Sequence, residues 1–275
     1  MHIYTERYLT QFEVRLPLPI WQIRIDEKNG RLGVETRDAD TLQNAFYVID
    51  SQTGSFVLED YKTKAGWWSG LEDIYNGCLY LHRSNNQQFG QHEGILALDA
   101  NTGNMLWEQP LYSFYGLAEA YILAKEPDQD ATNLVRLDYR TGTIIPGFIP
   151  LSETRIALHE FQAQRQQVSK VPSHYQENNI FFPELQLFLQ EVTRTKAVLA
   201  IDYLETDQYF VIGYYQTQPD LKYTYRLAVF DLNGKLLLQE KLKSNVTGIG
   251  LDNFFILNNT LIFNKYKDTL VGYGL

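Results

Sequence analysis

The sequence contains little cysteine and no long apolar run, and each shortage excludes something. One of its 275 residues is cysteine, Cys78, so no intrachain disulfide can form and a reducing compartment is indicated. No run of 18 apolar residues occurs, so we expect no transmembrane helix. The first 21 residues lack the basic and apolar regions of a signal peptide. These absences predict a cytoplasmic protein without membrane insertion.

Positive charge is also scarce. The chain has 24 Lys and Arg against 33 Asp and Glu, a net charge of −9, and no basic cluster stands out. Binding to nucleic-acid phosphates requires a basic stripe, so we expect no nucleic-acid partner. The hydrophobic share of 44% is ordinary for a globular protein, whereas 19 Tyr among 14% aromatics suits β-strands.

A short turn motif recurs between pairs of apolar runs. It reads Asp-x-x-Thr-Gly in three copies, and a shorter copy ends in Asn-Gly. The aspartate can accept backbone N–H groups two or so residues on, and the glycine supplies the positive φ that closes the hairpin. We interpret these residues as structural turn residues rather than catalytic ones: Asp50, Gly54, Asp99, Gly103, Asp138, Gly142, Asp231 and Gly234.

Strand-like segments come in groups of four with short turns, which is typical of propeller blades. Four such groups cover about 20–60, 68–108, 113–148 and 197–242, and a last group at 250–273 has only three strands. The N-terminal strand at 4–16 is available to complete that last group. The sequence therefore predicts an all-β fold: a single β-propeller domain of residues 1–275, with five four-stranded antiparallel blades, closed by the N-terminal strand.

One interval between turn aspartates does not fit this count. Asp138 and Asp231 are about twice as far apart as the other neighbouring pairs, so either a sixth blade has lost its motif or an insertion lies near 150–196. Apolar residues at Leu185, Phe188 and Val192 follow helical spacing after a proline. We therefore predict a partly helical insertion there, with six blades as the alternative.

The second copy of the turn motif resembles the repeat of a known family. Ala97, Asp99, Thr102, Gly103 and Trp107 are similar to the repeat of quinoprotein-type (PQQ-like) β-propellers, in which the Trp docks against the neighbouring blade. The dehydrogenases of that family carry a neighbouring Cys pair and acidic calcium ligands, whereas this chain has one cysteine, so we expect no cofactor. The stretch 249–273 is also similar to an uncharacterised domain of unknown function seen mainly in Bacteroidota, which implies no activity.

Motifs for metal binding and nucleophilic catalysis are missing. His159 begins a His-Glu-x-x segment that ends in Ala163 where a second His is needed, and the other histidines lack zinc-ligand spacing. There is no Gly-x-Ser-x-Gly elbow, and Cys78 has no evident His partner. We therefore predict no metal site and assign no catalytic residue.

The remaining candidates lie on the first strands of the groups or directly beside them, and the first strands would line the channel of a propeller. Aromatic residues beside carboxylates there could hold a sugar, a cationic ligand or a basic peptide. The alternative is that the aromatics pack between blades and the acids are solvated strand ends. The candidate binding residues are Trp67, Trp68, Glu72, Asp73, Tyr115, Glu119, Asp202 and Asp252.

Three functions remain open. The first is a non-catalytic binding or scaffold protein whose partner is a protein or a small ligand, with the 150–196 segment as part of the contact surface. The second is a glycan-directed hydrolase or lyase, which would need two channel carboxylates about 5–9 Å apart as acid and base. Glu72, Asp73, Glu119 and Asp202 are its candidates. The third is a quinone-dependent dehydrogenase.

Overall fold

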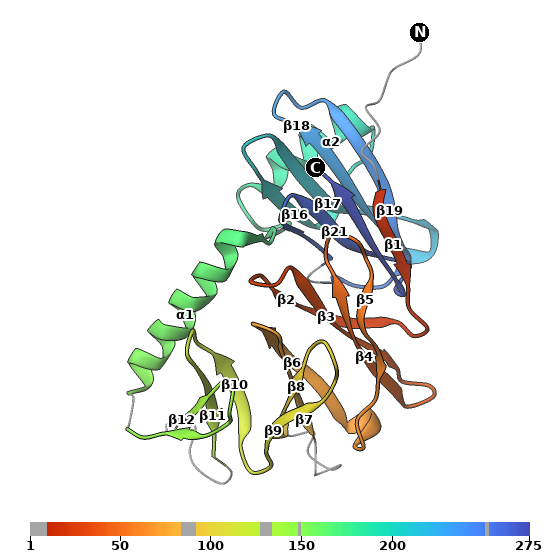
Figure 1. The fold of residues 1–275 in the computed structure, drawn as a ribbon. Helices are drawn as coiled ribbons and strands as arrows, with labels where there is room; N and C mark the ends of the chain where they lie inside the picture. The colour runs from red at the N-terminus through yellow and green to blue at the C-terminus, as the bar shows by residue number, and fades with distance from the viewer. Residues whose placement is uncertain (1–9, 84–91, 127–133, 148–149, 251–252) are drawn as a thin grey trace. The chain divides into compact units, whose positions relative to one another are not determined.

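The computed structural model describes residues 10–83, 92–126, 134–147, 150–250 and 253–275 (Figure 1). The chain divides into two compact units. Unit 1 consists of residues 1–15 and 170–275, and unit 2 of residues 16–169. Each unit is built from antiparallel sheets in which neighbouring strands are mostly consecutive in the chain.

Unit 2 contains three four-stranded sheets with simple up-and-down order. The first is β2 (Ile20–Asp26), β3 (Arg31–Asp38), β4 (Gln43–Asp50) and β5 (Phe56–Tyr61). The second is β6 (Ser69–Tyr75), β7 (Cys78–Arg83), β8 (Glu93–Asp99) and β9 (Met105–Gln109), preceded by the 3-10 turn η1 (Gly66–Trp68). The third is β10 (Ser113–Leu117), β11 (Tyr121–Lys125), β12 (Leu134–Asp138) and β13 (Ile144–Ile145).

The inner strands of the first two sheets are largely buried on both faces, and β4, β7 and β8 are accordingly rich in apolar residues. Val48 in β4 and Leu79, Leu81 and Leu98 in β7 and β8 are fully buried in one cluster between the first two sheets. Burying such a side chain contributes about 1.5–3 kcal/mol. This cluster holds the two sheets in one unit.

The Asp-x-x-Thr-Gly segments form hairpin turns. In the first, Oδ1 of Asp50 accepts hydrogen bonds from the backbone N–H groups of Gln52 (3.0 Å) and Thr53 (2.8 Å), and Gly54 has φ +70°. The carboxylates of Asp99 and Asp138 accept from their own turns in the same way, and that of Asp231 accepts from the shorter turn. The turn therefore uses the aspartate and the glycine for backbone geometry.

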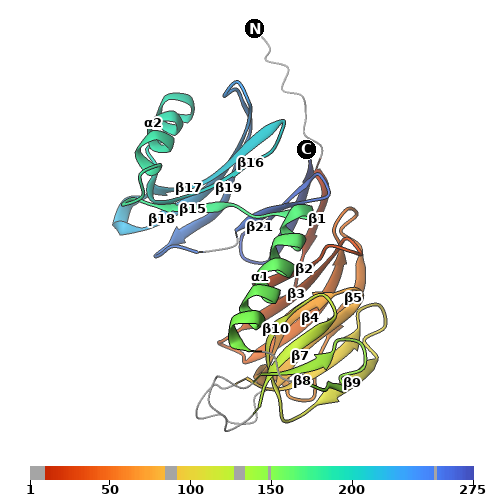
Figure 2. The ribbon, with the colours of Figure 1, turned by 90° about the vertical axis from the view of Figure 1, so that its left-hand side faces the viewer.

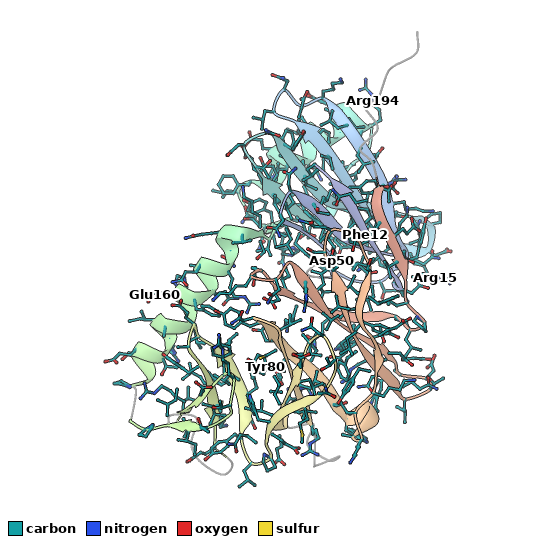
Figure 3. All side chains as sticks on the ribbon, viewed as in Figure 1. Phe12, Arg15, Asp50, Tyr80, Glu160 and Arg194 are labelled. Atoms are coloured by element: carbon teal, nitrogen blue, oxygen red, sulfur yellow. The ribbon has the colours of Figure 1, made fainter. Side chains whose placement is uncertain are left out.

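Trp107 joins the second sheet of unit 2 to the third. Its indole Nε1 donates to the backbone oxygen of Tyr139 at 3.2 Å, and Tyr80 (labelled in Figure 3) donates its hydroxyl to the same oxygen at 3.0 Å. The ring lies against Gly142, where a Cβ would stand 2.6 Å from the indole. The close approach requires glycine at this turn position.

Helix α1 (Leu151–Val168) ends unit 2 and runs beside β10 (Figure 2). It is largely polar, and residues such as Glu160 are exposed to solvent (Figure 3). Leu158, Phe161 and Arg165 attach it to the sheets, Leu158 by lying against Gly116 of β10. Phe161 packs edge-on against Tyr75 with ring centroids 5.1 Å apart, and Arg165 forms ion pairs with Glu27 (2.9 Å) and Asp73 (2.7 Å).

Unit 1 contains two five-stranded sheets. The first has the order β1 (Thr10–Arg15), β22 (Thr269–Gly274), β21 (Thr260–Lys265), β20 (Phe254–Leu257) and β14 (Ser169–Lys170), the last where the chain passes from unit 2 to unit 1. The second is β15 (Ser173–Gln176), β16 (Val198–Glu205), β17 (Tyr209–Thr217), β18 (Tyr223–Asp231) and β19 (Leu236–Val246), with the 3-10 turn η2 (Pro219–Leu221).

Helix α2 (Phe182–Thr193) covers part of the second sheet of unit 1. Phe188 contacts Phe210 and Phe230 with centroid separations of 5.6 Å and 5.1 Å, and Leu189 is fully buried. The helix ends at Thr193, and the next residue, Arg194 (labelled in Figure 3), terminates it with a left-handed backbone, φ +60°. The apolar spacing seen in the sequence is therefore the face that α2 buries.

The prediction of a single closed five-bladed propeller was wrong. The described residues form five separate sheets in two units, none of them closed, and two of the sheets have five strands. The expected pairing of the N-terminal strand is present, because β1, which carries Phe12 (labelled in Figure 3), pairs with β22. In this pairing Phe12 lies opposite Gly272. The repeated turns determine each sheet locally, but a closed ring depends on contacts between sheets that the motif does not encode.

The 150–196 segment is partly helical, as predicted, but it is not one insertion. It contains α1, which belongs to unit 2, and then β15 and α2, which belong to unit 1. The interval between Asp138 and Asp231 is long because the chain changes units within it. The organisation as a single domain stays a prediction, since compactness of two units does not decide whether they unfold together.

Candidate functional site

The first strand of each sheet in unit 2 carries a β-bulge. The bulges fall at Trp21 in β2, Glu72 in β6 and Tyr115 in β10, each of which has no partner residue on the next strand. A bulge re-aims a side chain and is common next to binding sites. Trp21 is 68% exposed and Tyr115 is 45% exposed, so these large rings are presented to solvent.

Two of these bulges border a pocket of about 430 Å³ in unit 2. The pocket lies between the first and second sheets, at the end where η1 leads into β6. Three tryptophans, four charged residues and two histidines contribute to it. The lining residues are Trp21, Gln22, Arg24, Glu35, Arg37, Trp67, Trp68, Leu71, Glu72, His82 and His92.

The floor of the pocket is a buried polar network centred on Glu35. Its fully buried carboxylate accepts hydrogen bonds from Gln22 Nε2 and from the backbone N–H of Leu71, both at 2.7 Å, and from Arg37 Nε. Arg37 also donates to the backbone oxygen of Trp67 at 3.1 Å. Because each charge has an opposite partner and further hydrogen bonds, the network can remain buried and fixes the floor.

The walls of the pocket are aromatic. The Arg37 guanidinium lies 4.8 Å from the ring centroid of Trp67, a cation–π contact that fixes that indole. Trp68 is 37% exposed and follows directly in η1, while Trp21 projects from its bulge on β2. On the same side, Arg24 donates to the backbone oxygen of Glu72 at 3.0 Å. Planar apolar surface therefore stands beside fixed polar groups.

Glu72, His82 and His92 converge at one edge of the pocket. Oε1 of Glu72 lies 2.7 Å from Nδ1 of His82 and 3.0 Å from Nδ1 of His92. The two imidazoles stack with centroids 3.6 Å apart and an interplanar angle of 16°. All three potential ligand atoms lie within 4.8 Å of one another, which makes this a group that could hold a metal ion.

The electrostatics of this group favour an ionised carboxylate. Burial acts to raise the pKa of Glu72, but hydrogen bonds from His82 and His92 outweigh it and hold the pKa below its usual value. The hydrogen bond to Glu72 in turn raises the pKa of His92. Glu72 is therefore poorly suited to act as a general acid, which needs a raised pKa.

The structure brings together three of the predicted site residues and separates the others. Trp67, Trp68 and Glu72 line the pocket. Asp73, the next residue, instead pairs with Arg165 of α1 at 2.7 Å. Tyr115 in β10 and Glu119 in the bend after it do not line the pocket, Asp202 lies in unit 1, and Asp252 lies outside the described residues.

Asp202 is the centre of a buried network in unit 1. Oδ1 lies 2.6 Å from His174 Nδ1, and Oδ2 accepts from the Tyr225 hydroxyl and, at 3.4 Å, from Asn253 Nδ2. Lys243 donates to Asn253 Oδ1 at 2.8 Å, and burial lowers the pKa of its ammonium group. Burial likewise raises the pKa of Tyr225. This network ties β15, β16 and β18 to the residues before β20.

His82 and His92 do not have the spacing along the chain that sequence motifs for metal ligands require. His82 lies on β7 opposite Gly70, and His92 lies just before β8, so strand pairing brings them to Glu72. One feature of the sequence could have indicated the site: the two histidines lie in the hairpin that follows β6, and β6 carries Glu72. A Cβ at Gly70 would stand 2.4 Å from the His82 ring, so a small residue is needed opposite it.

A protein-family profile, the domain of unknown function DUF4905, matches residues 25–107. The matched segment lies in unit 2 and contains Glu72, His82 and His92; it does not include the 249–273 stretch for which a resemblance was expected. A comparison with curated proteins gives no match. Among the described residues, no helix is both long and apolar enough to cross a membrane.

Several solved structures are similar to the chain. The β-propeller domain of the trilobed protease from Pyrococcus furiosus is 9% identical with a TM-score of 0.33; the match covers 92% of this chain and 65% of that one. The oligogalacturonate lyase from Vibrio parahaemolyticus is 10% identical with a TM-score of 0.32, covering 97% and 92%. The endo-arabinase from Bacteroides thetaiotaomicron is 15% identical with a TM-score of 0.28, covering 94% and 89%.

Proposed function

We propose that this chain is a non-catalytic binding protein that holds a small polar ligand in the pocket of unit 2. The observation that carries the proposal is the combination of exposed indole rings with a floor whose polar groups are already paired. Trp21 and Trp68 offer planar apolar surface, while Glu35 and Arg37 are fixed by each other. Ligand sites are mostly apolar surfaces with a few placed polar groups, which describes this pocket.

The class of ligand that fits best is a saccharide. A sugar ring has an apolar face that can lie on an indole and hydroxyl groups at its edge that can reach Glu72, His92 or Arg24. Tryptophan also has few rotamers to lose on binding, so a ligand that stacks on it binds at low entropic cost. A pocket of about 430 Å³ is of the size that takes a small molecule rather than a folded protein.

A glycan-directed hydrolase or lyase is less well supported. Asp73 is held by Arg165 and does not line the pocket, and Glu35 and Glu72 are both hydrogen-bonded within their own networks. The lowered pKa of Glu72 disfavours it as the proton donor. A quinone-dependent dehydrogenase has no supporting observation among the described residues.

The test is a titration with neutral and acidic oligosaccharides, in which binding is measured by intrinsic tryptophan fluorescence and by calorimetry. Truncating a tryptophan at the centre of a binding surface costs about 2 kcal/mol or more, which is roughly 30-fold in Kd. We expect losses of that size for Trp21→Ala and Trp68→Ala. Tyr266→Ala, which removes an exposed aromatic ring in unit 1, serves as the control and should leave the Kd unchanged.

If no saccharide binds, or if both tryptophan variants bind as well as the parent chain, the proposal is wrong. A cytoplasmic location and the absence of a nucleic-acid partner belong to the same proposal. They are supported by the single Cys78 and by the net charge of −9.

A further inference from the structure

We propose that Glu72, His82 and His92 form a binding site for one divalent transition-metal ion of the zinc class. The three side chains come from β6, from β7 and from the residue before β8, so only the fold brings them together. They are the one such group among the residues that the structure describes. Two imidazoles and one carboxylate are a ligand set that zinc uses in sites that keep an open position.

An ion can enter once the stacked imidazoles, whose centroids are 3.6 Å apart, rotate so that a nitrogen of each ring points at it. Ligand atoms about 2.1 Å from a tetrahedral ion lie roughly 3.4 Å from one another. Nδ1 of His82 and Nδ1 of His92 are at present 2.7 Å and 3.0 Å from Glu72 Oε1, so these two distances must open by about half an ångström. All three ligand atoms lie within 4.8 Å of one another, so the two imidazole nitrogens must reach the same spacing. A carboxylate oxygen can only accept, so both imidazoles now donate a proton to the place that the ion would take.

The charges around the group also suit a cation. Glu72 forms ion pairs only with His82 and His92 among the described residues, so no Lys or Arg there neutralises its carboxylate. Two arginines also line the pocket: Arg37 is already paired with the buried Glu35, and Arg24 donates to the backbone oxygen of Glu72. The negative charge of Glu72 is therefore available to an ion, whereas that of Glu35 is not.

Two features of the backbone hold the ligands in position. The bulge at Glu72 removes this residue from the regular pairing of β6 with β7. The pairing of β7 with β8 is also irregular: His82 pairs with Ile95 and Arg83 with Glu93. Gly94, whose φ is +77°, therefore has no partner on β7. His82 is buried and fixed, whereas the side chain of His92 is 57% exposed and can move onto an ion.

The open side of the site faces the pocket with Trp21, Trp67 and Trp68. A bound ion would therefore have at least one position for water or for an oxygen atom of a ligand. This inference rests on the geometry of the three ligands and not on the proposed saccharide, so either can fail without the other.

The test is calorimetric titration of the full-length protein, first treated with a chelator, with Zn²⁺ alone. We expect one ion per chain. Glu72→Gln and His92→Asn should each weaken binding by at least about 100-fold, because even the loss of an outer-shell partner weakens metal sites 10–100-fold. His159→Asn, which removes an exposed histidine of α1, is the matched control and should bind as the parent does. Mg²⁺, which prefers six oxygen ligands, should not compete.

Because His92 is exposed, His92→Asn should fold normally, and circular dichroism checks this. Co²⁺ provides a second readout, since imidazole coordination gives it a visible absorption spectrum that His92→Asn should change. The inference is overturned if the parent binds no Zn²⁺, if His92→Asn binds it equally well, or if His159→Asn loses binding to the same extent.

Discussion

Replacing Arg165 with methionine should destabilise unit 2 strongly. The guanidinium donates to Glu27 Oε2 at 2.9 Å and to both oxygens of Asp73 at 2.7 Å and 3.0 Å. The side-chain exposures are 17% for Arg165, 8% for Glu27 and 13% for Asp73, so the substitution would leave two carboxylates nearly buried without a cation. Breaking a buried pair in this way costs about 3–5 kcal/mol, and the remaining exposure points to the lower end, about 3 kcal/mol.

The pKa of Glu27 supports this magnitude. Burial raises it above its ordinary value even though Arg165 acts to lower it, so the carboxylate is costly to keep ionised. Without Arg165 the folded-state pKa of Glu27 should rise further above that of the unfolded chain. The penalty should then be full near neutral pH and should shrink as the pH falls toward the unfolded value of about 4. It should vanish below that value, where the carboxylate is protonated in the folded and in the unfolded chain.

Urea unfolding followed by tryptophan fluorescence measures the effect, because Trp21, Trp67, Trp68 and Trp107 all lie in unit 2. The triple variant Arg165→Met, Glu27→Gln, Asp73→Asn is the control and should recover most of the loss, since no ionisable group is then left unpaired. A loss below about 1 kcal/mol for Arg165→Met, or a loss that does not change between pH 7.5 and pH 4.5, would refute the reasoning.

Two further predictions concern packing and cooperativity. Gly142→Ala should destabilise the chain by about 3 kcal/mol, because it combines a left-handed φ of +68° with a Cβ 2.6 Å from Trp107. Gly77→Ala, with φ +79° and no atom within 4 Å of the Cβ, should cost only about 1–2 kcal/mol, and equal urea midpoints would contradict the packing argument. If the chain is a single domain, tryptophan fluorescence from unit 2 and circular dichroism from both units should give one coincident transition, whereas two separate midpoints would show independent units.

Much of the local structure could be predicted from the sequence, because it depends on residues close together in the chain. The turn at Asp50 and its copies follow from side-chain hydrogen bonds over two or three residues. The helix over 182–193 follows from its apolar spacing. The pairing of the N-terminal strand with β22 could be inferred because the last group lacked one strand.

The arrangement of the sheets and most of the site could not be predicted in the same way. The change of unit near residue 169 has no Asp-x-x-Thr-Gly turn to mark it. Trp67, Trp68 and Glu72 were identified as candidates because they lie on or beside a first strand, and they do share a pocket. Asp73 was grouped with them by adjacency, but the bulge at Glu72 separates the two, and Arg165, 92 residues later, binds Asp73.

The bulges on β2, β6 and β10 have a consequence for how this pocket can be gained or lost. Each is a single additional residue in an otherwise regular strand. Deleting Glu72 would restore regular pairing with β7 and remove the carboxylate, while the hairpin and the buried cluster behind it would keep their residues. The framework and the pocket are thus separable by one-residue changes in length, so a chain with the same sheets could bind a different ligand or none.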